Sequence, residues 1–237
     1  MAESGRSQRV SDAIIVFARL DSARLPGKAL TLVAGKFLLD RVVDRCKATP
    51  GSPKVIVATS DREIDDPIAH HMSSRGELLF RGAAEDVAGR ALACADAHDL
   101  DRFARVSGDS PFIDPGLIAY CLARSRQGGA ELVTNVFPRT YPNGVSVEVI
   151  TTVAMRRIVA ATADPEDREH VTRYAYQRAE HFTLDNVSAS DDRYVGVSLA
   201  VDTQVDHAKA CWIIETHGDD IDLDTATNAA REWEIRI

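Results

Sequence analysis

The chain has 237 residues, of which 45% are hydrophobic and 27% are charged, and its formal net charge at neutral pH is −8. A chain of this length and composition can bury one full α/β core, and no long polar linker divides it. The acidic balance excludes a nucleic-acid polymer as partner, because binding a phosphate backbone needs a broad basic surface. A single nucleotide needs only a local basic pocket.

The N-terminal residues are polar and contain no apolar stretch of the kind found in signal peptides or membrane anchors. We therefore expect a disordered tail at residues 1–12, one folded domain at residues 13–237, a cytoplasmic location and no membrane association. The cysteines show neither a Cys-x-x-Cys pair nor a histidine at metal-ligand spacing. We interpret them as buried, reduced thiols within predicted helices: Cys46, Cys94, Cys121 and Cys211.

Hydrophobic periodicity predicts alternating strands and helices. In the first part of the chain, strands are expected at residues 13–18, 54–59, 78–80, 103–107 and 131–136, and helices at 38–48, 67–74, 86–98 and 115–126. Further on, strands are expected at 145–150, 182–186 and 195–201, and helices at 151–161, 168–178 and 205–217. The pattern predicts an α/β fold with helices on both faces of a mostly parallel central sheet, extended by a small mixed β region.

A basic loop, residues 18–28, follows the first predicted strand. Arg19, Arg24 and Lys28 supply three positive charges, and Ser22 adds a hydroxyl. The Pro-Gly turn at residues 26–27 lets backbone N–H groups face an anion. The sequence of this loop does not match the Walker motif, Gly-x-x-x-x-Gly-Lys-Ser/Thr. A solvated basic loop is the alternative, but the position directly after a buried strand favours a polyphosphate site.

Two aspartates are candidate metal ligands because each follows a predicted strand, where ligands bind in open parallel sheets. Asp109 lies in a Gly-Asp-Ser-Pro segment after the strand at 103–107, and Asp202 ends the strand at 195–201. Carboxylates from separate strands suit magnesium, which prefers oxygen ligands and keeps positions open for phosphate and water. By residue type alone, an ordinary loop acid is the favoured interpretation of each.

Two neighbouring aspartates receive structural interpretations instead. Asp114 precedes Pro115 at a predicted helix start, which is typical of an N-cap followed by proline at the first helical position. Asp206 stands three residues after Thr203, at the spacing of a capping box.

The basic loop resembles the nucleotide-binding signature of the sugar cytidylyltransferases, a family that includes the CMP-Kdo and CMP-nonulosonate synthetases and the SpsF-type proteins. Further matching segments lie at residues 57–60, 80–82, 85–87, 105–111, 141–144, 147–149, 168–172 and 201–203. Their order is similar to that of the SpsF-type branch over roughly residues 13 to 215. Two departures are Phe17, where glutamine is frequent, and Asn143, where aspartate is common.

The resemblance implies a single-domain, three-layer, Rossmann-like nucleotidyltransferase fold of the GT-A-like kind. It implies a magnesium-dependent homodimer that transfers CMP from CTP to an acceptor, releases pyrophosphate and serves surface polysaccharide or related biosynthesis. It implies catalytic roles for Arg19, Lys28, Asp109 and Asp202, with the two aspartates as magnesium ligands. It implies nucleotide contacts from Ala18, Arg19, Ser22, Arg24, Lys28, Ser60, Arg81, Gly82 and Asp109.

On the acceptor side, the resemblance implies contacts from Arg139, Tyr141, Asn143, Glu148, Arg168 and His170. The arginines, with Arg173, suit a small anionic acceptor that bears a carboxylate, phosphate or phosphonate. By residue type alone His170 would be structural or solvated, and the Glu-His-Val-Thr match favours a substrate contact. Glu148 either hydrogen-bonds an acceptor hydroxyl or is an outward-facing strand residue.

Two other functions stay open. A nucleotidyltransferase that uses another nucleoside triphosphate would keep the basic loop and the aspartates and change only the base pocket. A non-catalytic nucleotide-binding protein would bind without turnover, and the presence of Lys28, Asp109 and Asp202 argues against it.

Overall fold

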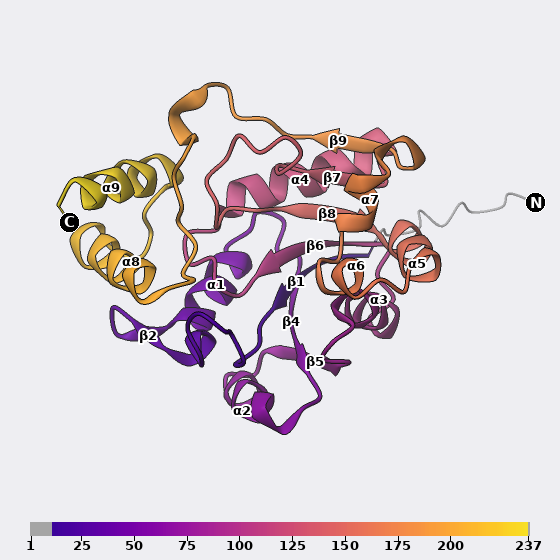
Figure 1. Ribbon diagram of the computed structural model, residues 1–237, viewed down its shortest axis with the longest axis horizontal. Helices are drawn as coiled ribbons and strands as arrows, with labels where there is room; N and C mark the ends of the chain where they lie inside the picture. Colours follow the sequence, from indigo (N-terminus) through magenta and orange to yellow (C-terminus); the bar gives the residue numbers. More distant parts are fainter. Residues whose placement is uncertain (1–10, 237) are drawn as a thin grey trace, which may run out of the picture.

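The computed structural model describes residues 11–236, and its centre is a seven-stranded sheet in the order β5-β4-β1-β6-β8-β7-β9 (Figure 1). In chain order these strands are β1 (Asp12–Phe17), β4 (Lys54–Ser60), β5 (Leu78–Gly82), β6 (Arg102–Ser107), β7 (Leu132–Thr134), β8 (Glu148–Thr151) and β9 (Leu184–Asn186). A separate antiparallel hairpin consists of β2 (Leu32–Val33) and β3 (Lys36–Phe37).

The predicted mostly parallel sheet is confirmed. Strands β5, β4, β1 and β6 run parallel, and β7 runs parallel to β9. Strand β8 is antiparallel to both of its neighbours, β6 and β7, which gives the mixed second half. The strand β1 has β4 on one side and β6 on the other, so the crossover connections diverge at β1. In open α/β sheets ligands bind beyond the carboxyl ends of strands at such a point.

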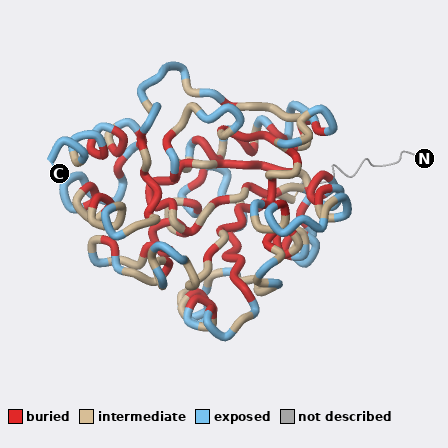
Figure 2. Tube along the Cα trace, in the orientation of Figure 1, coloured by how far each residue is buried: buried red, intermediate tan, exposed pale blue. Residues whose placement is uncertain are grey.

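Helices cover both faces of the sheet, as expected. They are α1 (Leu38–Lys47), α2 (Asp66–Ser74), α3 (Val87–Ala97), α4 (Pro115–Gly128), α5 (Thr152–Ala161), α6 (Pro165–Glu169), α7 (Arg173–Gln177), α8 (Gln204–His217) and α9 (Leu223–Arg236). Alternation along β1 sends Ile14 and Val16 into the core beside α1, α4 and α8, and Ala13 and Ile15 into the core beside α3 and α5. Figure 2 shows the strands buried between these helices.

Several predicted boundaries are wrong. The predicted helix at 168–178 is two short helices, α6 and α7, because the buried Val171 has φ of 25° and interrupts the turn. The predicted strand at 195–201 forms only one isolated bridge, between Asn143 and Ser198. The predicted strand at 145–150 begins only at Glu148. Helix α9 and the β2–β3 hairpin were not among the predicted elements.

The expected tail at residues 1–12 falls mostly on residues 1–10, which lie outside the described residues. Its boundary is wrong, because Asp12 already belongs to β1 and Ser11 exchanges hydrogen bonds with Asp101. The two cap predictions are confirmed. The Asp114 side chain accepts the Leu117 N–H at 2.6 Å, and Thr203 with Asp206 forms a capping box on α8.

Candidate active site

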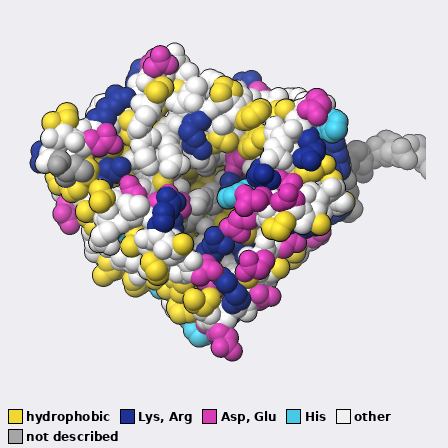
Figure 3. Space-filling model, viewed as in Figure 1, with side chains coloured by type: hydrophobic (Ala, Val, Ile, Leu, Met, Phe, Trp, Pro, Cys, Tyr) yellow, Lys and Arg dark blue, Asp and Glu magenta, His cyan; other side chains and the backbone are white. Residues whose placement is uncertain are grey.

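A cavity of about 590 Å³ opens at the carboxyl ends of β1 and β6. It is lined by Phe17, Ala18, Arg19, Ser22, Ala23, Arg24, Lys28, Ala29, Val87, Arg90, Arg105, Ser107, Gly108, Asp109, Ser110, Asn143, Gly144, Ser146, Glu169, His170, Ala200 and Asp202. In Figure 3 the face is hollowed near its centre, where basic and acidic side chains gather around the opening. The position agrees with the ligand site expected for an open parallel sheet.

The basic loop folds back on itself before it enters the cavity wall. Gly27 has φ of 75°, a conformation that glycine adopts at no steric cost, and its N–H donates to the Leu20 carbonyl at 2.8 Å. The Leu20 N–H in turn donates to the buried Asp65 carboxylate at 2.7 Å. These bonds fix the loop at both ends, and Lys28 follows at the start of a short 3₁₀ helix.

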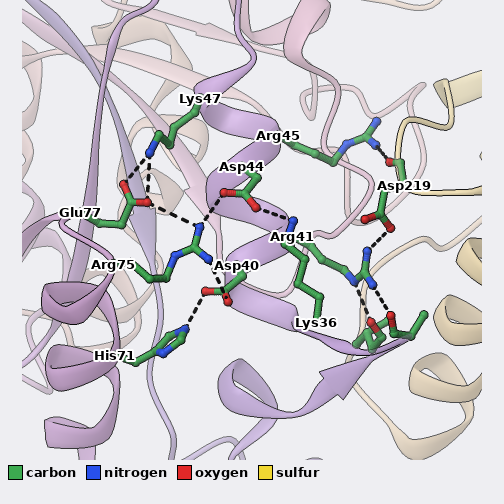
Figure 4. Close-up of polar contacts among 12 residues, drawn as sticks. Lys36, Asp40, Arg41, Asp44, Arg45, Lys47, His71, Arg75, Glu77 and Asp219 are labelled. Atoms are coloured by element: carbon green, nitrogen blue, oxygen red, sulfur yellow. Dashed lines mark hydrogen bonds and ion pairs between the residues drawn. The ribbon is translucent and has the colours of Figure 1, made fainter.

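Helix α1 fixes the chain directly after this loop (Figure 4). The buried Arg41 guanidinium donates to the carbonyls of Val33 and Ala34 in the β2–β3 hairpin, both at 2.8 Å, and pairs with Asp219 ahead of α9. One turn further on, Arg45 donates to three main-chain carbonyls, including that of Asp219 at 2.9 Å. The α1 arginines therefore tie the hairpin and the segment before α9 to helix α1.

Lys28 joins the two predicted metal ligands. Its Nζ lies 2.7 Å from Asp109 Oδ2 and 2.8 Å from Asp202 Oδ1, and the Lys28 side chain is 13% exposed. The Val201 N–H donates to the Asp109 carbonyl at 2.9 Å, which holds the two aspartate segments side by side. The ammonium thus occupies the position between two carboxylates that any cation entering this site would compete for.

A close backbone approach brings Asp202 to this position. Gly144 has φ of 87°, and a Cβ there would lie 2.3 Å from the Ala200 nitrogen, so only glycine fits. The adjoining Asn143 lines the cavity, and its carbonyl accepts the Leu199 N–H at 2.7 Å. The segment before Asp202 therefore pairs with this turn and does not form the expected strand of the sheet.

The loop arginines differ in their surroundings. Arg24 is 66% exposed and lies 3.1 Å from Asp202, whereas Arg19 lies 2.7 Å from Glu169 at the end of α6. Arg90 of α3 also lines the cavity, and burial, with the nearby Arg19 charge, lowers the pKa of its guanidinium. Neither Arg90 nor Glu169 was among the predicted site residues. Arg90 lies outside every matching segment and gave no local sequence signal, whereas Glu169 lies within the matching segment 168–172, which could have indicated it.

Three predicted nucleotide contacts lie outside the cavity. The Ser60 hydroxyl donates to Asp65, and Arg81 donates to the Ser60 carbonyl at 3.0 Å and pairs with Asp66 at 2.7 Å. Gly82 packs against the Arg90 side chain. Because the hydrogen-bonding groups of Ser60 and Arg81 are used within the protein, these residues stabilise the β4–β5 edge that carries Asp65.

Two predicted acceptor residues are also elsewhere. Arg168 pairs with Asp86 at 2.8 Å and donates to the carbonyls of Thr162 at 2.9 Å and Val159 at 2.8 Å, so it ties α6 to α3 and α5. Tyr141 stacks on Tyr194 with ring centroids 5.4 Å apart and lines a different cavity beside α4.

A second cavity, of about 430 Å³, adjoins the first and shares Arg105, Ser146 and His170 with it. It also contains the predicted residues Arg139 and Glu148, together with Val136, Phe137, Thr172, Arg173, Tyr176 and Gln177. The Arg139 guanidinium donates to Ser146 Oγ at 3.0 Å, and burial lowers its pKa. The structure therefore brings Arg139, Glu148 and His170 together beside the first cavity.

The fold and the polar cavity at its switch point are those of a nucleotidyltransferase. Residues 13–216 match the family model described as cytidylyltransferase, and the chain belongs to this family. Nucleotidyltransferase activity is the function of this family, which confirms the predicted enzyme class. Among residues 11–236, no helix is both long and apolar enough to cross a bilayer.

Relatives of known name agree with the family assignment. The chain is 28% identical over 217 residues to the spore coat polysaccharide biosynthesis protein SpsF of Bacillus subtilis, with 88% of each chain covered. It is 33% identical over 180 residues to a 3-deoxy-manno-octulosonate cytidylyltransferase of Idiomarina loihiensis, covering 68% of this chain and 66% of the relative.

Solved structures give the same fold. A cytidylyltransferase from Leptospira borgpetersenii superposes with a TM-score of 0.88 at 26% identity, covering 94% of each chain. A CMP:2-keto-3-deoxy-manno-octonic acid synthetase complexed with CTP superposes with a TM-score of 0.68 at 16% identity, covering 87% of this chain and 99% of the other. The predicted α/β nucleotidyltransferase fold is therefore confirmed.

Proposed function

We propose that the protein catalyses the magnesium-dependent transfer of CMP from CTP to a small anionic acceptor, with release of pyrophosphate. The observation that carries the proposal is the meeting of Lys28, Asp109 and Asp202 at the wall of the first cavity, beside the basic loop. A triphosphate needs positive charge along its length and a cation held by oxygen ligands at the reacting phosphate.

The two aspartates suit magnesium by their donor set. Magnesium in nucleotide enzymes is held by one or two carboxylates together with substrate phosphates and water, not by an all-protein cage. This agrees with residues 11–236, which contain no cluster of three or more His, Cys, Asp or Glu placed to hold a metal. Asp109 and Asp202 would hold the ion, which when bound neutralises charge that develops on the phosphates.

The reaction is an in-line displacement at phosphorus. An acceptor oxygen forms a bond to the α-phosphorus of CTP, the bond to the bridging oxygen breaks, and pyrophosphate leaves with that electron pair. An ionised phosphate or phosphonate attacks without losing a proton, whereas a sugar hydroxyl gives its proton to water or to the leaving pyrophosphate. Lys28, Arg24 and Arg19 are placed to neutralise the triphosphate and the leaving pyrophosphate. Since Lys28 is bound to both aspartates, its ammonium would shift from these oxygens toward phosphate oxygens if the aspartates held a metal ion through them.

The acceptor belongs in the second cavity. Its lining contains three guanidinium groups, from Arg105, Arg139 and Arg173, and one carboxylate, from Glu148. An excess of guanidinium groups suits a carboxylate, phosphate or phosphonate. The names of the two relatives support an acidic sugar and a role in surface polysaccharide synthesis. The same family resemblance supports a homodimer, which sedimentation equilibrium would test.

The test is a pyrophosphate-release assay with CTP, UTP, GTP and ATP, each with a panel of acceptors: 3-deoxy-manno-octulosonate, methylphosphonate, inorganic phosphate and glucose as neutral control. We expect turnover with CTP and an anionic acceptor, and mass spectrometry should show a product that contains CMP. Preference for another triphosphate would establish the alternative nucleotidyltransferase. Tight CTP binding without turnover across a wide acceptor panel would favour the non-catalytic alternative.

A further inference from the structure

A buried ion pair lies in the wall between the two cavities. Arg105 of β6 and Glu148 of β8 are direct partners in the antiparallel register, and the Arg105 guanidinium donates to Glu148 Oε2. Arg105 lines both cavities, and 27% of its side chain is exposed, whereas Glu148 is 3% exposed. The arginine is therefore the partner with access to bound substrates.

Both oxygens of Glu148 are used within the protein. While Oε2 accepts from Arg105, Oε1 accepts from Thr172 Oγ1 and from Tyr176 Oη, each at 2.5 Å. The Tyr176 hydroxyl also contacts Thr134 Oγ1 of β7 at 2.8 Å. The carboxylate oxygens expected to accept a hydrogen bond from an acceptor hydroxyl thus accept hydrogen bonds from protein groups, which hold the carboxylate in place.

The network keeps Glu148 ionised. Burial alone would raise the pKa of this carboxyl group, but the Arg105 charge and the hydrogen bonds from Thr172 and Tyr176 outweigh burial and lower it. A fixed carboxylate orients the planar guanidinium beside it, because Arg presents its donors in a rigid fork. Glu148 is accordingly a positioning residue for Arg105.

Arg105 has donors to spare. Among residues 11–236 its hydrogen bond runs from Nη1 to Glu148, and Nη2 donates to no protein group. Because part of the side chain is exposed to the cavities, Nη2 can donate to a bound anion. Arg139 lines the same cavity and donates to Ser146 Oγ at 3.0 Å and to the Pro142 carbonyl at 3.3 Å, and no carboxylate of the described residues pairs with it. Arg173, by contrast, is already paired with Asp167.

We infer that Arg105, oriented by Glu148, binds the anionic group of the acceptor together with Arg139, at the junction of the two cavities. This inference rests on the proposed function and names the residues that bind the anionic group of its acceptor. The acceptor would carry a carboxylate, phosphate or phosphonate within reach of Arg105, on the path between the second cavity and the nucleotide phosphates. A neutral sugar would leave the Arg139 guanidinium without a counterion among the described residues.

The variants must separate binding from folding. Removing one partner of a buried ion pair leaves the other charge uncompensated and can unfold a protein. The main variant is therefore the double substitution Arg105→Gln/Glu148→Gln, which removes both charges and keeps hydrogen-bonding amides. Arg105→Lys retains the charge without the planar fork. Arg156→Gln is the control, because Arg156 forms an exposed ion pair with Asp96 on α3.

The measurement is isothermal titration of each protein, first with the non-reactive analogue cytidine 5′-(α,β-methylene)triphosphate and magnesium. Acceptor probes are then added to the analogue-saturated protein: 3-deoxy-manno-octulosonate, methylphosphonate, inorganic phosphate and glucose. We expect at least one anion to bind the wild-type protein more tightly than glucose. We expect the double variant to bind that anion at least tenfold more weakly, Arg105→Lys to show a partial loss, and Arg156→Gln to show none.

The analogue titration keeps the two failures apart. If the wild-type protein does not bind the cytidine analogue, the proposed function fails. The comparison of anion binding between the wild type and the double variant tests only the role of Arg105. The inference is supported if the double variant loses anion binding and keeps its affinity for the analogue within about threefold. A folding defect would weaken the binding of both ligands. Unchanged anion binding in the double variant, or no preference for any anion over glucose in the wild-type protein, overturns it.

Discussion

The Lys28 ammonium lies 2.7 Å from an oxygen of Asp109, and in the same position it lies 2.8 Å from Asp202. A side chain expected to bind phosphate is thus held by the carboxylates expected to bind magnesium. We expect entry of a divalent ion to be coupled to movement of Lys28, because the ion and the ammonium would compete for the same oxygens. A bound nucleotide would offer Lys28 a new anionic partner.

Replacing Lys28 tests this coupling. Lys28→Met should bind Mn²⁺ more tightly than the wild-type protein when no nucleotide is present, because the competing cation is gone. Its turnover should fall by about ten- to a thousandfold, the range for losing a charged contact at reacting phosphates. Electron paramagnetic resonance of free Mn²⁺ measures the binding. Lys36→Met, which loses an ion pair with Asp44, is the control. Weaker Mn²⁺ binding in Lys28→Met would contradict the competition.

Arg24→Ala should have a smaller effect than Lys28→Met. Its side chain is far more exposed and has one ionic contact, with Asp202, so its contribution is more strongly screened by water and salt. We expect a rise in the KM for CTP that grows as ionic strength is lowered. Steady-state kinetics at two salt concentrations measures it, and a salt-independent loss as large as that of Lys28→Met would show that Arg24 acts at the reacting phosphorus.

Substitutions of Asp109 and Asp202 should affect turnover, whereas substitution of Asp206 should affect stability. Asp202→Asn and Asp109→Asn should nearly abolish turnover without unfolding the protein, because each removes a charged cation ligand. Asp206→Ala should retain turnover and lose about 1 kcal/mol of stability, since its carboxylate caps α8. Turnover and urea denaturation of the three variants provide the comparison. An inactive Asp206→Ala of normal stability would mean that Asp206, not Asp202, is the functional carboxylate.

Arg168 should affect stability and not the acceptor. Its guanidinium is used by Asp86 and by two main-chain carbonyls, so Arg168→Gln should cost about 1 to 3 kcal/mol of unfolding free energy. The KM values for CTP and acceptor should be unchanged at temperatures where the variant is folded. Arg156→Gln, at an exposed pair, should cost less than about 0.5 kcal/mol. A rise in the KM for the acceptor, with the KM for CTP unchanged, would indicate that Arg168 contacts the acceptor.

The buried Glu148 should make stability pH-dependent. Its pKa in the folded protein is below the ordinary value of 4.5, so the unfolded chain takes up a proton first on acidification. The stability due to ionised Glu148 is therefore present above about pH 4.5 and is lost as pH falls through the lowered pKa. Urea denaturation of the wild type and of Arg105→Gln/Glu148→Gln between pH 7 and pH 3 tests this. The wild type should lose more stability on acidification, and parallel curves would contradict the prediction.

The sequence by itself determined the fold class and the first half of the site. Strands such as β1 are read from continuous β-branched runs, and Lys28 follows β1 within a loop whose charges are local in the chain. Caps at Asp114 and Asp206 were predictable for the same reason, because capping depends on neighbours three residues away. Family resemblance extended this local reading to Asp109 and Asp202.

Tertiary structure decided which side chains actually reach the cavities. Ser60, Arg81, Arg168 and Tyr141 lie in matching segments, yet their polar groups or rings are used elsewhere in the fold. Glu148 lies beside Arg105 because β8 pairs antiparallel with β6. Such a pairing joins residues far apart in the chain. Strand register, burial and competing hydrogen bonds decide which side chains meet, and the hydrophobic periodicity of the sequence does not encode them.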